Sequence, residues 1–108
     1  MLKIAIMQPT FIPWIGYFNL IKLVDKFIFL DDVQFDKRSW QQRNRILINN
    51  QPHFLTIPVK TKNKFSQLIN QVEIDYDTDW VKKHSLTLKN NYGKCKFLKN
   101  FFLYIIKY

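Results

Sequence analysis

Two neighbouring carboxylates and two nearby arginines are the side chains of this sequence best suited to chemistry. Asp31 and Asp32 end an apolar run, and Arg43 and Arg45 follow shortly afterwards. Adjacent carboxylates at a strand end can hold Mg²⁺ or act as a base, and arginines can clamp phosphate oxygens. The simpler alternative is that these charges pair with one another while Trp40 fills the core. The cluster therefore predicts either phosphate chemistry or a structural set of ion pairs.

A second candidate is the polar and aromatic segment Gln8–Phe18, which connects a predicted strand to a predicted helix. In α/β folds this place commonly builds a ligand site. Ile12 is a poor N-cap, so the first main-chain N–H groups of the helix would favour a phosphate or carboxylate. Gly16 in the first turn is consistent with close packing against the main chain. Alternatively, Gln8 or Thr10 caps the helix and Gly16 accommodates another element.

His84 is the third candidate, and it shares a predicted helical face with Trp80 and Leu88. A histidine among apolar neighbours is commonly a packed, hydrogen-bonded residue. If its side chain points into the same cleft as Asp31 and Asp32, its near-neutral pKa suits acid–base catalysis.

A strand, a loop, a helix and a second strand must position the first two candidates. We predict strands at Lys3–Met7 and Lys26–Leu30, with a helix that starts at Pro13 between them. This order within about 30 residues is the βαβ signature, which favours parallel strands joined by a right-handed crossover. The fold class is therefore α/β.

The middle of the chain predicts a hairpin and a further strand. The hairpin strands are Arg45–Ile48 and His53–Val59 around the turn Asn49–Pro52, with Pro58 favouring an edge position. Leu68–Ile74 is predicted as another strand.

Two helices are predicted towards the C-terminus. The first is capped by Asp77 or Thr78 and stopped by Gly93, and the second runs from Lys96 to Tyr108. The apolar side chains of the second need a partner surface, which favours a truncated chain. A short homologue or a homodimer formed through this segment are the alternatives.

Composition bounds these hypotheses. A chain of 108 residues with 47% hydrophobic and 17% aromatic residues predicts one globular domain despite a net charge of +9. A single cysteine, Cys95, excludes an internal disulfide and a zinc quartet, and two glycines exclude Walker and dinucleotide-binding loops. No secretory signal or bilayer-spanning stretch is visible, so we expect a cytoplasmic protein. The basic residues are scattered, which favours a solvated surface over nucleic-acid binding.

The order of the motifs makes the sequence similar to the WbqC-like family of bacterial proteins. The residues that carry this resemblance are Gln8-Pro9, Phe11–Phe18, Asp25, Asp31–Gln34, Ser39–Gln41, Arg43–Ile46, Leu55–Val59, His84 and Tyr92. Family members are usually longer, so the resemblance implies that residues 1–108 are a single WbqC-like domain lacking its C-terminal half. It also implies a place in O-antigen and other surface-polysaccharide clusters. The first strand and its loop look like the opening of a nucleotidylyltransferase-like or Rossmann-like core.

Together, residue chemistry and resemblance predict an enzyme that acts on a nucleotide-activated sugar or related intermediate, with acyl or aminoacyl transfer as one form of the reaction. The expected partner is a phosphate-bearing small molecule, and no cofactor or metal is specified. The alternatives are a non-catalytic basic binding module and an inactive remnant. The candidate catalytic residues are Asp31, Asp32 and His84, and the candidate substrate-binding residues are Gln8, Trp14, Gly16, Tyr17, Gln34, Trp40, Arg43 and Asn44.

Overall fold

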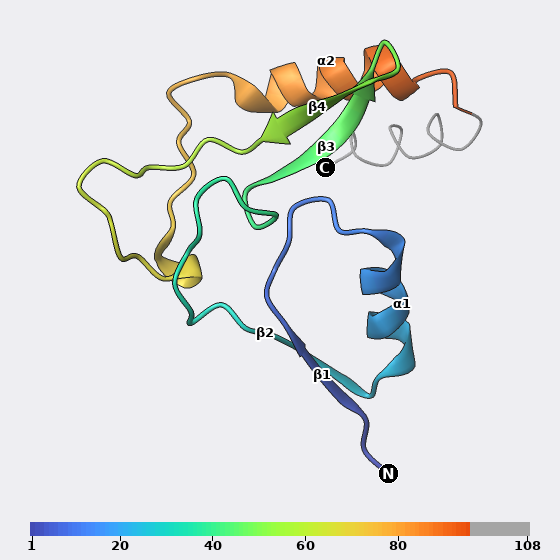
Figure 1. Ribbon diagram of the computed structural model, residues 1–108, viewed down its shortest axis with the longest axis vertical. Helices are drawn as coiled ribbons and strands as arrows, with labels where there is room; N and C mark the ends of the chain where they lie inside the picture. Colours follow the sequence, from blue (N-terminus) through green and yellow to red (C-terminus); the bar gives the residue numbers. More distant parts are fainter. Residues whose placement is uncertain (96–108) are drawn as a thin grey trace.

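The computed structural model describes residues 1–95 and has a mixed α/β fold (Figure 1). Its elements are β1 (Ile4–Met7), α1 (Ile15–Leu23), β2 (Lys26–Phe29), β3 (Arg43–Ile48), β4 (Gln51–Thr56), the 3-10 helix η1 (Ile69–Gln71) and α2 (Trp80–Tyr92). Within this part of the chain the strands form two separate two-stranded sheets, β1–β2 and β3–β4. The α/β class is confirmed, whereas a Rossmann-like or nucleotidylyltransferase-like core remains a prediction.

The N-terminal βαβ unit forms as predicted. β1 and β2 are parallel, with Ile4 beside Lys26 at one end of the register. α1 packs on one face of the pair through Tyr17, whose ring meets that of Phe27 edge-on at 5.4 Å between centroids. The helix starts at Ile15 and not at the predicted Pro13, because Trp14, between them, has an extended backbone conformation.

The predicted hairpin is also present, with different bounds. β3 and β4 are antiparallel and are joined by Asn49 and Asn50, which both have positive φ, 50° and 61°. Asparagine tolerates this conformation, and two such residues make the tight turn that matches the twist of a hairpin. The turn is therefore shorter than predicted, and both strands begin earlier, at Arg43 and at Gln51.

The predicted strand Leu68–Ile74 is wrong. Its centre is the 3-10 helix η1, because Gln71 returns to Leu68 through two bonds: its main-chain N–H donates to the Leu68 carbonyl, and its side-chain oxygen accepts from the Leu68 N–H. Only isolated bridges remain on either side, joining Gln34 to Leu68 and Val59 to Ile74. A polar side chain that bonds its own main chain here outcompetes the sheet.

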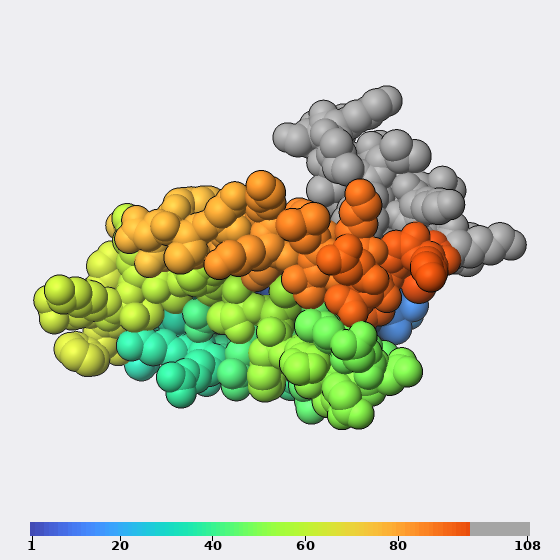
Figure 2. Space-filling view, turned by 90° about the horizontal axis from the view of Figure 1, so that it is seen from above, coloured from blue at the N-terminus to red at the C-terminus, as the bar shows by residue number. Residues whose placement is uncertain are grey.

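α2 lies along the hairpin, as Figures 1 and 2 show. The Tyr92 hydroxyl accepts a hydrogen bond of 2.6 Å from the Leu47 N–H of β3, which ties the end of the helix to the strand. Asp79 caps the helix by accepting from the Lys82 N–H, so the predicted caps were one or two positions too early. Gly93 ends α2 as predicted, and the helix predicted from Lys96 lies outside the described residues.

The buried apolar core is small. It consists of Tyr17, Phe35, Ile46 and Leu55, so α1, the hairpin and the segment between the two sheets each contribute to it. Within residues 1–95, no helix combines the length and the apolar character that crossing a bilayer requires.

Candidate functional site

The loop between β1 and α1 is fastened to the segment that enters β3. Gln41 donates a 2.8 Å hydrogen bond from Nε2 to Oε1 of Gln8, and the Phe11 N–H donates to the Trp40 carbonyl, also at 2.8 Å. Two candidate binding residues, Gln8 and Trp40, therefore lie on segments that these bonds hold side by side. The side-chain oxygen of Gln8 is used in holding the loop in place.

Asn44 completes this attachment from the start of β3. Its Nδ2 group donates to the carbonyls of Phe11, at 3.1 Å, and of Ile12, at 2.7 Å, and its Oδ1 accepts from the Arg45 N–H. Ile12 has a φ of 46°, a conformation that β-branched residues rarely adopt. Asn44, predicted to bind substrate, thus uses its amide to stabilise a strained turn of the loop.

Tyr17 anchors the same loop to α1. Its hydroxyl donates a 2.9 Å hydrogen bond to the Gln8 carbonyl, and burial raises the pKa of the phenol above its ordinary value. The ring belongs to the core. This placement gives Tyr17 a structural task in addition to the predicted contact with a ligand.

The N-terminus of α1 has no side-chain cap, which confirms the prediction made from Ile12. Trp14 occupies the N-cap position without a side-chain hydrogen bond, and its indole is exposed. The six-membered ring of this indole lies across Gly16, where a Cβ atom would overlap it. Gly16 therefore makes room for the Trp14 side chain. This agrees with the alternative that Gly16 accommodates a neighbouring group, although the sequence did not identify Trp14 as that group.

The outer face of the hairpin carries an arginine–aromatic pocket of about 200 Å³, which we define by Arg38, Ser39, Trp40, Arg43 and Phe54. The Arg43 guanidinium lies 3.8 Å above the centroid of the Phe54 ring, at stacking distance. Trp40 lies beneath a second guanidinium, at 5.6 Å from its ring.

Arg45 supplies that second guanidinium, so the two arginines share a face as their two-residue spacing predicts. Stacking fixes the plane of a guanidinium while its N–H edge remains free to bind an oxyanion. The pocket therefore combines groups that suit a phosphate with exposed rings that suit an aromatic base. Sequence reasoning missed Phe54, and only the hairpin register, which pairs it with Arg45, could have identified it.

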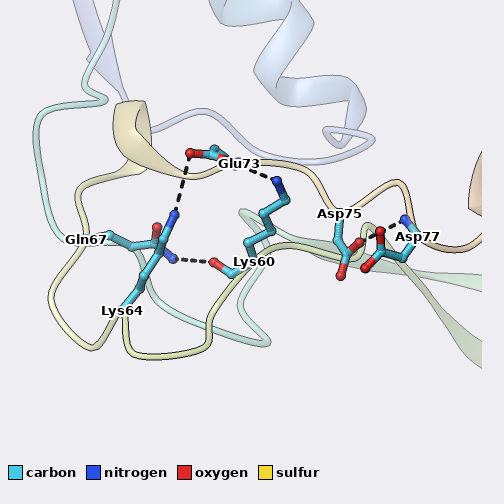
Figure 3. Close-up of polar contacts among 6 residues, drawn as sticks. All are labelled: Lys60, Lys64, Gln67, Glu73, Asp75 and Asp77. Carbon is cyan, nitrogen blue, oxygen red and sulfur yellow. Dashed lines mark hydrogen bonds and ion pairs between the residues drawn. The ribbon is translucent and has the colours of Figure 1, made fainter.

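The ion pairs of the described residues lie elsewhere, between the loop before η1 and the segment just after it (Figure 3). Both carboxylate oxygens of Glu73 are paired, one with Lys60 at 3.1 Å and one with Lys64 at 3.6 Å. These contacts lower the pKa of Glu73 and raise that of Lys60. The three side chains are exposed, so the pairs contribute little to stability. Since none of these pairs within residues 1–95 uses an arginine or Asp31 or Asp32, the structural alternative of mutual pairing is not observed.

The three candidate catalytic residues do not form one cluster within residues 1–95. Asp31 and Asp32 are exposed after β2, and Figure 1 places this end of β2 well apart from α2, which carries His84. The His84 ring instead contacts Trp80, at 5.0 Å between centroids, and Phe11, at 6.1 Å. Burial lowers the pKa of His84, and a hydrogen bond to the main chain of the neighbouring strand partly offsets this effect.

Gln34 is exposed, and the bridge to the residue before η1 involves its main chain. Close by is a second, mainly apolar hollow of about 210 Å³, lined by Pro9, Phe35, Gln41, Gln42, Ile57, Val59, Ile69, Val72 and Ile74. Its two glutamine amides already bond the protein: Gln41 with the loop and Gln42 with the Ile57 carbonyl. Among residues 1–95, no three His, Cys, Asp or Glu side chains gather in a way that could hold a metal ion.

Fold and site together define a small α/β protein in which a βαβ unit presents its loop to a hairpin with an arginine–aromatic outer face. The chain belongs to the WbqC-like protein family, which matches residues 8–107. It is 48% identical over 93 residues to the uncharacterized protein Rv1507c of Mycobacterium tuberculosis strain ATCC 25618 / H37Rv. That match covers 86% of this chain and 40% of the relative, so the chain spans about two-fifths of the relative's length. No solved structure matches the chain.

Proposed function

We propose that the chain is part of an enzyme of surface-polysaccharide biosynthesis that binds a nucleotide-activated sugar in the arginine–aromatic pocket. In this proposal Arg43 and Arg38 contact the phosphates, and the rings of Trp40 and Phe54 contact the nucleotide base. In this reaction an acyl or aminoacyl unit passes from an activated donor such as a thioester to an amino or hydroxyl group of the sugar, which loses a proton while the donor's thiol leaves. Membership in the WbqC-like family supports the proposed place in surface-polysaccharide biosynthesis, and the arginine and aromatic side chains of the pocket support a nucleotide-activated sugar as the ligand.

One observation carries the proposal: Arg43 is stacked but has no carboxylate partner among residues 1–95. An exposed ion pair contributes little to stability, so the informative part of this observation is the stacking of the guanidinium on Phe54. An arginine whose plane is fixed by a ring and whose edge is free is arranged for a planar or tetrahedral oxyanion. The neighbouring exposed indole adds a surface on which a base can stack.

The proton-handling residues in this proposal are Asp31 and Asp32, which are exposed after β2. The side chain of His84 is less suited to a role beside them, since its contacts are with Phe11 and Trp80. If it takes part, it acts as a neutral base, because burial disfavours its charged form. In the same proposal, the βαβ unit with its polar loop is one part of a nucleotidylyltransferase-like core.

Calorimetric titration of the 108-residue chain with uridine, thymidine and guanosine diphosphate sugars tests the proposal. Arg43→Ala should weaken binding by about 10- to 100-fold, because a charge-assisted hydrogen bond contributes roughly 1.5–3 kcal/mol. Arg43→Lys should recover only part of the loss, since an ammonium does not stack on Phe54 as a guanidinium does. Lys62→Ala removes one exposed positive charge away from the pocket and serves as the matched control. Failure of every nucleotide sugar to bind, or equal effects of Arg43→Ala and Lys62→Ala, would contradict the proposal.

The same face also provides the specific observation behind the second candidate function, a nucleic-acid-binding module. Exposed rings next to arginines can stack the bases of a single strand, and the net charge of +9 would assist. Anisotropy titrations with labelled RNA and DNA over a range of salt concentrations separate the two functions. Oligonucleotide binding with a steep salt dependence, together with no response to nucleotide sugars, would favour the second.

A further inference from the structure

Among residues 1–95, the β1–β2 sheet has one face covered by α1 and one face that no described element covers. Because the strands are parallel and Ile4 pairs with Lys26, the side chains of Ile4, Ile6, Lys26 and Ile28 point to the same side. The opposite side carries Phe27, on which Tyr17 of α1 packs. We call the first set the isoleucine face. In Figure 1, α1 lies on one side only of the β1–β2 pair.

The exposure of these side chains matches this geometry. Ile4, Ile6 and Ile28 are 50%, 57% and 45% exposed. On the helix side, Ala5, Met7 and Phe27 are half-buried, while Phe29 at the end of β2 is 55% exposed. Parallel sheets normally have both faces covered, and a pair of strands alone is at best marginally stable in water. Three isoleucines in register on an open parallel pair therefore indicate a surface that another layer covers.

We propose that the isoleucine face, with the strand edges that no element of residues 1–95 pairs with, is the docking surface for the part of the WbqC-like protein that lies outside the matched region of the M. tuberculosis relative. This chain covers 40% of that relative, which leaves about three-fifths of its length to supply a covering layer and further strands. A partner of that size can cover both the face and an edge. The proposal does not depend on which ligand the hairpin binds.

Charge distinguishes this partner from a second copy of the chain. Lys26 is exposed on the isoleucine face, directly beside Ile4 in the register. In a symmetric pair each copy presents the same patch, so each Lys26 would be buried against the isoleucines of the other copy, and each copy carries a net charge of +9. Burying an ammonium group without a carboxylate partner is destabilising. The face therefore fits a polypeptide with an apolar layer and a carboxylate opposite Lys26.

Co-expression tests the proposal. The 108-residue chain, carrying an affinity tag, is produced together with the segment of Rv1507c that lies outside the matched region, and the mass of the purified species is measured by light scattering. We expect a one-to-one complex. The double variant Ile6→Lys/Ile28→Lys should weaken it by about 100-fold or more, since two buried isoleucines are each replaced by a charge. Leu47→Lys, which adds a charge at an equally exposed position of β3, should leave the complex intact.

Three results would overturn the inference. The first is a monomeric chain that captures nothing from the co-expressed segment. The second is a homodimer that the double variant dissociates, because it would assign the face to a second copy. The third is a one-to-one complex that the double variant leaves unchanged, because the contact would then lie on another surface. Circular dichroism of the double variant should match that of the parent chain, since both substituted isoleucines are already largely exposed.

Discussion

Replacing Tyr17 with phenylalanine isolates the hydrogen bond that fastens the β1–α1 loop to the helix. The side chain is only 3% exposed, and its hydroxyl donates to the Gln8 carbonyl at 2.9 Å. Tyr17→Phe keeps the ring against Phe27 and removes only the donor. A hydrogen bond of this kind contributes a net of about 0.5–1.5 kcal/mol, and a carbonyl left without a partner adds to the loss. We therefore expect a destabilisation of about 1–2 kcal/mol.

Thermal unfolding followed by circular dichroism measures this change. In a domain of this size, a loss of 1 kcal/mol lowers the melting temperature by about 4–8 °C. Tyr76→Phe is the matched control, since Tyr76 is 69% exposed and its hydroxyl can bond to water in both the folded and unfolded chain. Tyr17→Ala removes the ring as well and should cost about 3–5 kcal/mol, which approaches the whole stability of a small domain.

The pH dependence of stability provides a second readout for the same variant. Burial raises the pKa of Tyr17 in the folded chain, so the unfolded chain releases this proton first. The contribution of Tyr17 is therefore complete below the ordinary phenol pKa and is lost as the pH rises through the raised value. The parent chain should lose more stability above about pH 10 than Tyr17→Phe does. If Tyr17→Phe melts together with Tyr76→Phe at neutral pH, the bond does not fasten the loop and the reasoning fails.

Two further predictions concern the loop and α2. Gly16→Ala should gain less than the roughly 1 kcal/mol by which alanine is favoured over glycine in a helix, because its Cβ would push aside the exposed Trp14 indole; in a Trp14→Ala background the same substitution should gain the full amount. Thermal melts of the two single variants and the double variant measure this coupling, and additive changes would contradict the contact. Burial lowers the pKa of His84, so its contribution to stability is complete above the ordinary histidine pKa of about 6.5 and is lost as the pH falls through the lowered value. In His84→Gln, the free energy of unfolding measured in urea should depend less on pH over that acidic range than in the parent chain. The control His53→Gln, at an exposed position, should leave this pH dependence unchanged. If His84→Gln shows the same pH dependence as the parent chain, the assignment is refuted.

The parts of the fold that the sequence predicted correctly depend on local signals. Asn49 and Asn50 adopt the positive φ that their side chains tolerate, and this makes a hairpin turn recognisable without knowledge of what packs on it. Gly93 ends α2 where the apolar pattern stops. The βαβ unit follows from two short apolar runs on either side of a helical pattern. Each signal lies within a few residues of the structure that it specifies.

The errors arise where a distant or side-chain contact decides the outcome. Leu68–Ile74 was predicted as a strand, but the Gln71 amide closes a turn on Leu68 and leaves only isolated bridges. The sequence also could not show why position 16 is a glycine, because this depends on the rotamer of Trp14, whose ring lies over Gly16. A propensity pattern does not contain this information, because both outcomes satisfy the same local preferences.

The candidate site residues were likewise predicted from local patterns, and distant contacts determine what several of them do. Gln8, Tyr17 and Asn44 were selected because polar side chains at the ends of elements suit ligand binding, and all three use hydrogen-bonding groups to hold the β1–α1 loop. Asn44 reaches that loop across a sequence separation of 32 residues, a contact that no local pattern indicates. The side chains of Arg43 and Arg45 instead stack on aromatic rings in the described part of the chain.

Mutational tests of function must separate the residues that hold the β1–α1 loop from the residues that bind a ligand. Loss of activity on replacing Asn44 or Tyr17 would be expected whether or not either residue touches a substrate, because the loop would lose its attachment and the chain its stability. The Arg43 guanidinium stacks on Phe54, a half-exposed ring on the outer face of the hairpin, and makes no ion pair within residues 1–95, so its replacement should leave the melting temperature nearly unchanged. A change in ligand affinity without a change in stability is therefore the result that separates a binding residue from a positioning residue in this protein. Arg43 is the position of the predicted site at which that separation is sharpest.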